Sequence, residues 1–395
     1  MKRPRKLVVV ASGAAAALAM TLVACGESRS GHPSLIPQPP LTALNSRTRR
    51  RLAAASERVD LVAPSFSSES VKITNPLFPV SNLRSGILVG RLDGVPWRAE
   101  TTLLPRTETI SWNGVRVRTL RSQFVAYLGG RIFEVAVDRY AQAIDGSVWY
   151  FGEDAYTYDR GRVADTEGTW LAGRNGPPAM IMPAHPRVGD VYRTENIPGL
   201  VFEQVTVEKT NGAVTGPTGL VRGAMVGREL HMDEVRLERK VFAPGYGEFF
   251  SGGGTTFEAT ALVVPADSVS APMPAALKTL YESAVAVLGG GPRRPRIRRG
   301  PFDGPPRLIA QLDRAIATLA RAQGKRAAQR AAFDVANATL DLELQYRPPT
   351  TIDAARLRLW ALRVADDARA GDRPDVRGDI VTLGWIRDRL RTGAR

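Results

Sequence analysis

Acidic side chains lie close to aromatic ones between residues 145 and 167, and this combination could support chemistry on glycans. Glu153 and Asp154 follow Trp149, Tyr150 and Phe151, with Gly152 between them. Two carboxylates about 5–10 Å apart can act as acid and as nucleophile or base on a glycosidic bond. Acids are also common in turns, and aromatic residues commonly fill cores. Glu153 and Asp154 therefore remain the catalytic alternative, whereas the main expectation is a protein that is not an enzyme.

Other catalytic and metal-binding chemistries lack the residues that they need. The 395-residue sequence contains three histidines, His32, His185 and His231, and one cysteine. Zinc centres use His and Cys ligands at short characteristic spacings, and the sequence shows no such spacing. It also has no Gly-x-Ser-x-Gly nucleophile elbow and no P-loop. We therefore expect no metal site and no cofactor.

Four aromatic residues are candidates for binding a ligand in a protein that catalyses no reaction. Trp97, Trp149, Tyr150 and Trp170 all lie in the part of the chain with strand patterns. A curved sheet could present them on a concave face to a hydrophobic or glycan-like ligand, or to a partner protein. The alternative is that these large rings are part of the core.

The N-terminal segment has the layout of a bacterial lipoprotein signal peptide. A basic stretch, residues 2–6, precedes an apolar run that ends in Leu22-Val23-Ala24-Cys25. We expect cleavage to remove residues 1–24 and to leave Cys25 as a diacylglyceryl-modified, N-acylated first residue. More than one acyl chain anchors a protein stably. The mature protein is therefore expected outside the cytoplasm, held by lipid to the cell membrane or the outer membrane.

The chain is basic, and its charge bears on its partners. The formal net charge of +15 would fall to +11 on loss of the four basic residues of the signal peptide. A basic surface outside the cytoplasm attracts anionic lipids, wall polymers or glycans, so a structural protein that associates with such surfaces is a second alternative. The expected location argues against a nucleic-acid partner.

Composition and turn signals divide the chain into segments. Residues 25–70 are rich in Ser, Pro and Arg and predict a lipidated N-terminus with a flexible tether. Residues 71–264 predict an antiparallel β domain of about ten strands, in the form of a curved sheet, half-barrel or sandwich. Its hairpin signals are Asp93-Gly94, Asn113-Gly114, Asp145-Gly146 and Asn211-Gly212, with a further turn at 159–161.

The remainder of the chain changes to a helical pattern. Residues 265–305 predict a linker that contains one helix, at 272–288, and an Arg/Pro-rich run, at 292–299. Residues 306–395 show four successive helical periodicities, which are typical of a small bundle. The fold class expected from these patterns is α+β and multidomain: an antiparallel β-meander followed by a small C-terminal helical bundle.

Several short motifs occur in a fixed order along the β region. They are Asp145-Gly-Ser-Val-Trp-Tyr-Phe-Gly-Glu-Asp154 together with the stretches 73–79, 168–173, 188–193 and 242–247. Over roughly residues 73–250 they resemble a group of bacterial secreted proteins and lipoproteins without an assigned biochemical role. The resemblance implies a β-rich envelope domain and carries over no catalytic residue. We therefore expect a membrane-anchored extracytoplasmic lipoprotein with a non-catalytic ligand- or partner-binding role in the cell envelope.

Overall fold

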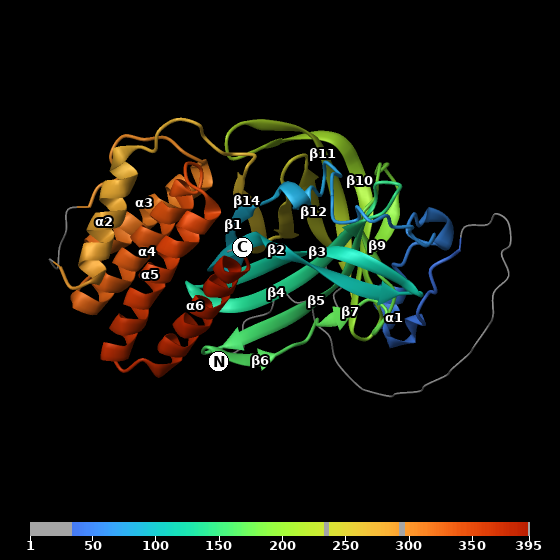
Figure 1. The fold of residues 1–395 in the computed structure, drawn as a ribbon, viewed down its shortest axis with the longest axis horizontal. Helices are drawn as coiled ribbons and strands as arrows, with labels where there is room; N and C mark the ends of the chain where they lie inside the picture. The colour runs from blue at the N-terminus through green and yellow to red at the C-terminus, as the bar shows by residue number, and fades with distance from the viewer. Residues whose placement is uncertain (1–33, 233–236, 292–296, 394–395) are drawn as a thin grey trace.

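The structure, a computed structural model, describes residues 34–232, 237–291 and 297–393. The predicted signal peptide, Cys25 and residues 292–296 of the Arg/Pro-rich run lie outside this range. Fourteen strands form one open antiparallel sheet, and helices follow it toward the C-terminus (Figure 1). The predicted α+β class, with a β-meander before a helical region, is confirmed. In the described part of the chain, no helix is long and apolar enough to cross a lipid bilayer.

The sheet follows the chain as a meander. Its order is β6-β5-β4-β3-β2-β1-β14-β13-β12-β11-β10-β9, and the short strands β7 and β8 pair with β5. The strands are β1 (Ser85–Leu92), β2 (Val95–Trp112), β3 (Val115–Leu128), β4 (Arg131–Gln142), β5 (Val148–Asp159), β6 (Arg162–Asp165), β7 (Trp170–Leu171), β8 (Ala179–Met182), β9 (Val191–Ile197), β10 (Val201–Thr215), β11 (Leu220–His231), β12 (Leu237–Ala243), β13 (Gly247–Gly253) and β14 (Thr256–Val264).

Tight turns between successive strands produce this meander. Asp93-Gly94 joins β1 to β2 with φ of 49° and 83°, and Asn113-Gly114 joins β2 to β3 with φ of 50° and 75°. Positive φ at both central positions matches the twist of the flanking strands, and Asn, Asp and Gly tolerate it best. These two hairpins are as the sequence predicts. Residues 143–147, which include Asp145-Gly146, form the expected turn between β4 and β5.

The hairpin predicted at Asn211-Gly212 is wrong. β10 continues through both residues to Thr215, although Asn211 has a φ of 55°. The pairing of β10 with β11 shifts register on both sides of Gly212, so the dipeptide forms a β-bulge within the strand. The chain reverses only after Thr215, where the amide of Gly216 donates to the carbonyl of Gly219. A bulge and a hairpin turn both need positive φ, so the same dipeptide suits either.

The sheet curls so strongly that strands at opposite ends of its order face each other (Figure 1). β8 pairs with β5 and also lies beside β9. Glu153 on β5 is close enough to Glu195 on β9 for their charges to interact. The concave face therefore encloses an interior, while the opposite face is free to pack on the helices.

The helices pack on the convex face of the first strands (Figure 1). They are α2 (Ala275–Leu288), α3 (Pro306–Arg321), α4 (Lys325–Glu343), α5 (Pro349–Arg369) and α6 (Arg373–Gly393). α2, which the sequence places in a linker, belongs to the bundle: its buried Leu280 joins the common core, and Gln329 on α4 donates to the carbonyl of its last residue, Leu288. Burial of its apolar stripe is the physical reason, because an isolated helix of this length is marginal in water.

Buried ion pairs join the bundle to the sheet. Glu100 on β2 accepts a hydrogen bond from Arg389 on α6 at 2.8 Å and lies 3.4 Å from a guanidinium nitrogen of Arg356 on α5. Arg98, also on β2, forms two hydrogen bonds with Asp341 on α4. Burial would raise the pKa of Glu100, but the surrounding arginines hold it well below its usual value. This cluster therefore fixes how the bundle sits on the sheet.

Residues 34–70, within the segment predicted as a flexible tether, are held by specific contacts. Leu35 forms a β-bridge with Val62, and the hydroxyl of Thr48 donates to the carbonyl of Met232 at 2.8 Å. Leu44 is buried against Phe202 on β10. The Ser/Pro/Arg composition concealed this packing, because the apolar residues that make it are few and irregularly spaced. A short helix, α1 (Ser46–Arg49), lies in this segment.

Candidate functional site

The interior of the curved sheet contains a cavity of about 240 Å³ lined by acidic side chains. Five carboxylates face it, together with hydroxyl groups of Ser, Thr and Tyr and the rings of two phenylalanines. The acids are Glu134, Asp138, Glu153, Glu248 and Glu258, and the aromatic residues are Phe78, Phe124, Tyr140 and Tyr246. Acids are rarely buried unless they are paired. Five around one small cavity therefore call for a functional explanation.

Asp138 and Glu153 form the centre of this site. They are direct cross-strand partners on β4 and β5, so their side chains leave the sheet on the same face. The Tyr150 hydroxyl donates to Asp138 at 2.8 Å. Burial raises the pKa of Asp138 to about 6. Burial, followed by the charges of Asp138 and Glu195, raises the pKa of Glu153 well above its usual value.

Glu153 lacks the partners that a buried carboxylate normally has. It is only 7 % exposed, and no group in the described residues donates a hydrogen bond to its carboxylate. A buried carboxylate without donors is costly in its charged form. Glu153 therefore offers an unsatisfied acceptor to whatever occupies the cavity.

A glycine positions Tyr150 beside this pair. Tyr150 and Glu153 are three residues apart, a spacing that would put them on opposite faces of a regular strand. The pairing of β4 with β5 shifts register between Asp138 and Tyr140, and Gly152 within the irregularity has a φ of 114°. A Cβ at Gly152 would lie 2.1 Å from the carbonyl oxygen of Trp170, so only glycine fits.

The opposite wall of the cavity carries charges from the last strands. The Trp97 indole donates to Glu258 on β14 at 2.9 Å, and burial raises the pKa of Glu258 to about 7. Lys240 on β12 lies 3.3 Å from Glu248 on β13 and 3.2 Å from Glu229 on β11. Lys240 is therefore already paired with two carboxylates, and its charge also favours the ionised forms of Glu203 and Glu258.

A second group of charges continues from the cavity along β9–β12. The Nδ1 of His231 is 3.1 Å from Glu203, and its Nε2 is 3.5 Å from Glu229. Burial alone would lower the pKa of His231, but the hydrogen bond to Glu203 and the charges of Glu203 and Glu229 outweigh it and hold the pKa well above its usual value. The ring is thus an imidazolium. Glu195 accepts from the Trp170 indole with one oxygen, while its other oxygen is buried without a hydrogen-bond partner in the described chain.

Within the described ranges of the chain, two groups of side chains have the geometry to hold a metal ion. Atoms of Glu203, Glu229 and His231 lie within 4.8 Å of one another. An imidazolium does not ligate metal, and the Lys240 ammonium already lies against Glu229, so this group is better described as an ion-pair network. The other group, on the helices, is Asp367, Asp372 and Asp375. Arginines already neutralise these acids, among them Arg330.

The interior as a whole has a large excess of acid. Among the residues that the structure describes, nine carboxylates share it with Lys240 and His231. The acids are Glu134, Asp138, Glu153, Glu195, Glu203, Glu229, Glu238, Glu248 and Glu258. Like charges in a low-dielectric site oppose ionisation, so several of these groups hold their protons near neutral pH. A cation in the cavity would allow the acids around it to ionise.

The residues predicted from the sequence divide between this site and the core. Glu153 lines the cavity, but Asp154 projects from the other face of β5 and pairs with Arg139 at 2.6 Å. The four aromatic candidates are all buried, with exposed fractions between 1 % for Trp170 and 6 % for Tyr150. Tyr150, Trp170 and Trp97 each donate a hydrogen bond to an acid of the interior. Trp149 donates to the hydroxyl of Ser147 instead.

Sequence reasoning missed most of the acids in the interior. Asp138, Glu195 and Glu258 occur in strands where every second residue points away from the convex face. A polar residue at such a position normally faces solvent. The curvature that turns this face into an interior depends on strand pairs such as β5 with β8. Local sequence patterns do not predict such pairs.

Comparisons with protein-family models, with curated proteins and with solved structures find no match. The side chains of the cavity and their electrostatics are therefore the basis on which a function can be assigned to the chain.

Proposed function

We propose that this protein is an extracytoplasmic lipoprotein whose β domain binds a small organic cation in the acid-lined cavity. The proposal combines the predicted lipid anchor at Cys25 with a non-catalytic binding role in the cell envelope. The single observation that carries the ligand class is the buried, donor-free carboxylate of Glu153 beside Asp138. A protonated amine would give both acids a partner.

The chemistry of the lining favours an aliphatic amine over other cations. Ammonium groups bind between carboxylates and aromatic faces, and Tyr140, Phe124 and Tyr246 supply such faces in the cavity. The volume of about 240 Å³ suits a short chain such as a diamine. A divalent metal would need three or more converging oxygens, and no trio of cavity acids in the described residues lies close enough together. The charge of the cavity also makes a purely hydrophobic ligand unfavourable.

Titration calorimetry with putrescine and with spermidine tests this proposal. We expect Glu153→Gln to weaken binding at least tenfold, because a hydrogen bond to a charged group contributes about 1.5–3 kcal/mol. Asp154→Asn is the matched control, since it removes one carboxylate from the adjacent residue on the opposite face. Equal losses in both variants, or no binding of either amine to the unmodified protein, would contradict the proposal.

Proton release gives this binding a distinctive signature. Because burial raises the pKa of Asp138 to about 6 and that of Glu258 to about 7, these acids are partly protonated near pH 6. A bound amine favours their ionised forms, so binding should release protons and strengthen between pH 5 and pH 8. Calorimetry in two buffers with different ionisation enthalpies measures the released protons directly.

The lipid anchor has its own test. Cys25→Ser removes the residue that would carry the acyl chains, so the mature protein should lose its lipid-dependent mobility shift and leave the membrane fraction. Retention in the membrane fraction would contradict anchoring at this cysteine. Amine binding by the cavity should be unchanged in this variant, so the two parts of the proposal can fail separately.

The acid pair leaves catalysis as a second candidate function. Two carboxylates with raised pKa values can act as general acid and base on a glycan. The pair that the structure brings together is Asp138 and Glu153, not the predicted Glu153 and Asp154. Hydrolysis of an envelope glycan by the unmodified protein, lost in both Asp138→Asn and Glu153→Gln, would favour this candidate over binding alone.

A further inference from the structure

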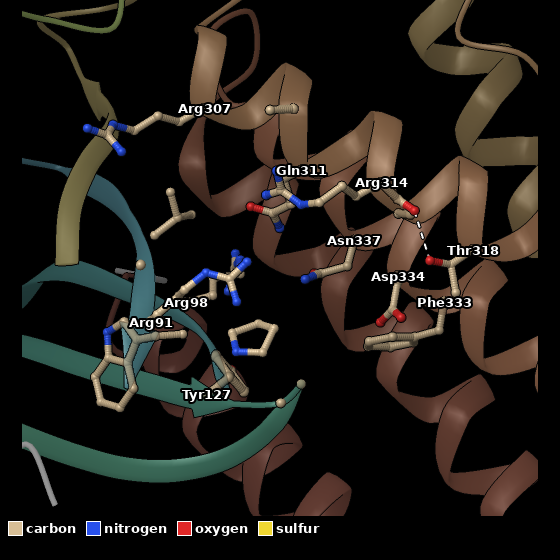
Figure 2. A pocket seen from close by; sticks show the side chains of 18 of the residues that line it. Arg91, Arg98, Tyr127, Arg307, Gln311, Arg314, Thr318, Phe333, Asp334 and Asn337 are labelled. Atoms are coloured by element: carbon tan, nitrogen blue, oxygen red, sulfur yellow. Dashed lines mark hydrogen bonds between the residues drawn. The ribbon is translucent and has the colours of Figure 1, made fainter. Parts of the chain in front are cut away.

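A second and larger hollow lies outside the sheet, between its convex face and the helices. It has a volume of about 610 Å³ and is lined by β1, β2 and β3 on one side and by α3, α4 and α5 on the other (Figure 2). We call it the arginine groove. It is separate from the acid-lined cavity, which opens on the concave face.

The lining of the arginine groove is basic. It includes four arginines and one acid, Asp334. In the described residues, Arg307 and Arg314 on α3 have no carboxylate partner, and both side chains are exposed. Arg91 on β1 donates only to the carbonyl of Gly94. The groove therefore has at least three guanidinium groups whose charge no acid neutralises.

Helical spacing directs the polar groups of α3 to one side. Arg307, Gln311, Arg314 and Thr318 recur at intervals of three and four residues, which places them on one face of the helix. Figure 2 shows the side chains of Gln311, Arg314 and Asn337 extending from the helices toward Arg98 on the sheet. Donors from two separate elements therefore converge on one space.

The remaining wall of the groove is aromatic. The ring of Trp360 stacks on Tyr127 at 5.6 Å and meets the edge of Phe333 at 4.8 Å. The Tyr127 hydroxyl is buried and has no hydrogen-bond partner in the described part of the chain. It lies among the buried charges of Glu100 and Arg389, whereas the amide of Asn337 extends into the groove and can donate to an acceptor there.

We propose that the arginine groove binds a phosphate group carried by a molecule with an apolar part. Guanidinium groups bind phosphate oxygens through paired N–H donors, and several of them around one space favour a group with several charged oxygens. The aromatic wall provides contact area for the apolar part. Such a phosphate group occurs in the headgroup of an anionic phospholipid. It also occurs in soluble phosphate esters that carry an apolar substituent.

Binding of two probes to the purified protein tests the proposal. The probes are vesicles of phosphatidylglycerol in phosphatidylcholine and, separately, soluble phenyl phosphate. We expect Arg307→Gln/Arg314→Gln to weaken binding at least tenfold. The control is Arg116→Gln/Arg358→Gln, which removes the same charge from exposed positions on β3 and α5 outside the groove. Circular dichroism verifies that both double variants are folded.

The outcomes separate the sources of the phosphate group. A groove-dependent loss with vesicles alone supports a phospholipid ligand, and a groove-dependent loss with phenyl phosphate supports a soluble ester. Equal losses in the groove variant and the control variant would mean that general surface charge attracts the probes, and would overturn the proposal. Binding of neither probe to the unmodified protein would overturn it as well.

Discussion

Replacing Glu258 by glutamine should stabilise the protein, and only above acidic pH. Burial raises the pKa of this carboxyl from 4.5 to about 7, so ionising it in the folded protein is unfavourable. Well below pH 4.5 the group is protonated in both the folded and the unfolded state, so it does not change the free energy of unfolding. Well above pH 7 the full difference of about 2.5 pKa units between the two states lowers the free energy of unfolding by about 3 kcal/mol. Glutamine is neutral throughout and can still accept from the Trp97 indole.

Urea unfolding at pH 4 and at pH 8.5 measures this effect. At pH 8.5 the free energy of unfolding of Glu258→Gln should exceed that of the unmodified protein by up to about 3 kcal/mol, and the gain should disappear at pH 4. The value is an upper limit, because acids that share one buried interior also share its protons. Glu208→Gln is the control: this exposed acid pairs with Arg228 at the surface and should change stability by less than about 1 kcal/mol.

Two results would refute this reasoning. An equal gain at both pH values would mean that glutamine improves packing and that charge has no part in it. A loss of stability at pH 8.5 would mean that the ionised carboxylate has favourable partners in the interior. If the predicted gain is found together with weaker amine binding, the acids of the interior would be a destabilising feature retained for function.

The remaining predictions concern the contacts that hold the segments together. Arg356→Met should destabilise the protein by about 3–5 kcal/mol, because it leaves Glu100 and Asp341 with fewer cations in a buried cluster. Thermal unfolding measures this loss of stability, and a loss below about 1 kcal/mol would contradict the prediction. Leu44→Ala should cost about 2 kcal/mol or more and free the segment before β1, because this side chain is buried against Phe202. Limited proteolysis should then cut near residue 50 while the sheet stays intact, and unchanged resistance to cleavage would show that the segment is held elsewhere.

Local sequence patterns predicted the secondary structure well where residues close in sequence determine it. The Asp93-Gly94 and Asn113-Gly114 hairpins and the helical periodicities after residue 306 follow from backbone preferences and apolar spacing within a few residues. Errors arose where two structures share one local requirement. Asn211-Gly212 supplies positive φ to a bulge as readily as to a turn, and the apolar stripe of α2 suits a linker helix as readily as a bundle member.

The sequence by itself determined the order of β-meander and helices, the scarcity of catalytic histidine and thiol groups, and the pattern that predicts a lipid anchor at Cys25. Only the tertiary structure decided which acids matter. Glu153 and Asp154 are neighbours in sequence, yet strand alternation directs one into the interior and the other to Arg139. Asp138 joins Glu153 through the pairing of β4 with β5, whereas Glu195 and Glu258 join them only because the sheet curls and β8 bridges β5 to β9. Electrostatic interactions act through space, so a cluster built from strands more than a hundred residues apart is set by the fold and not by any local motif.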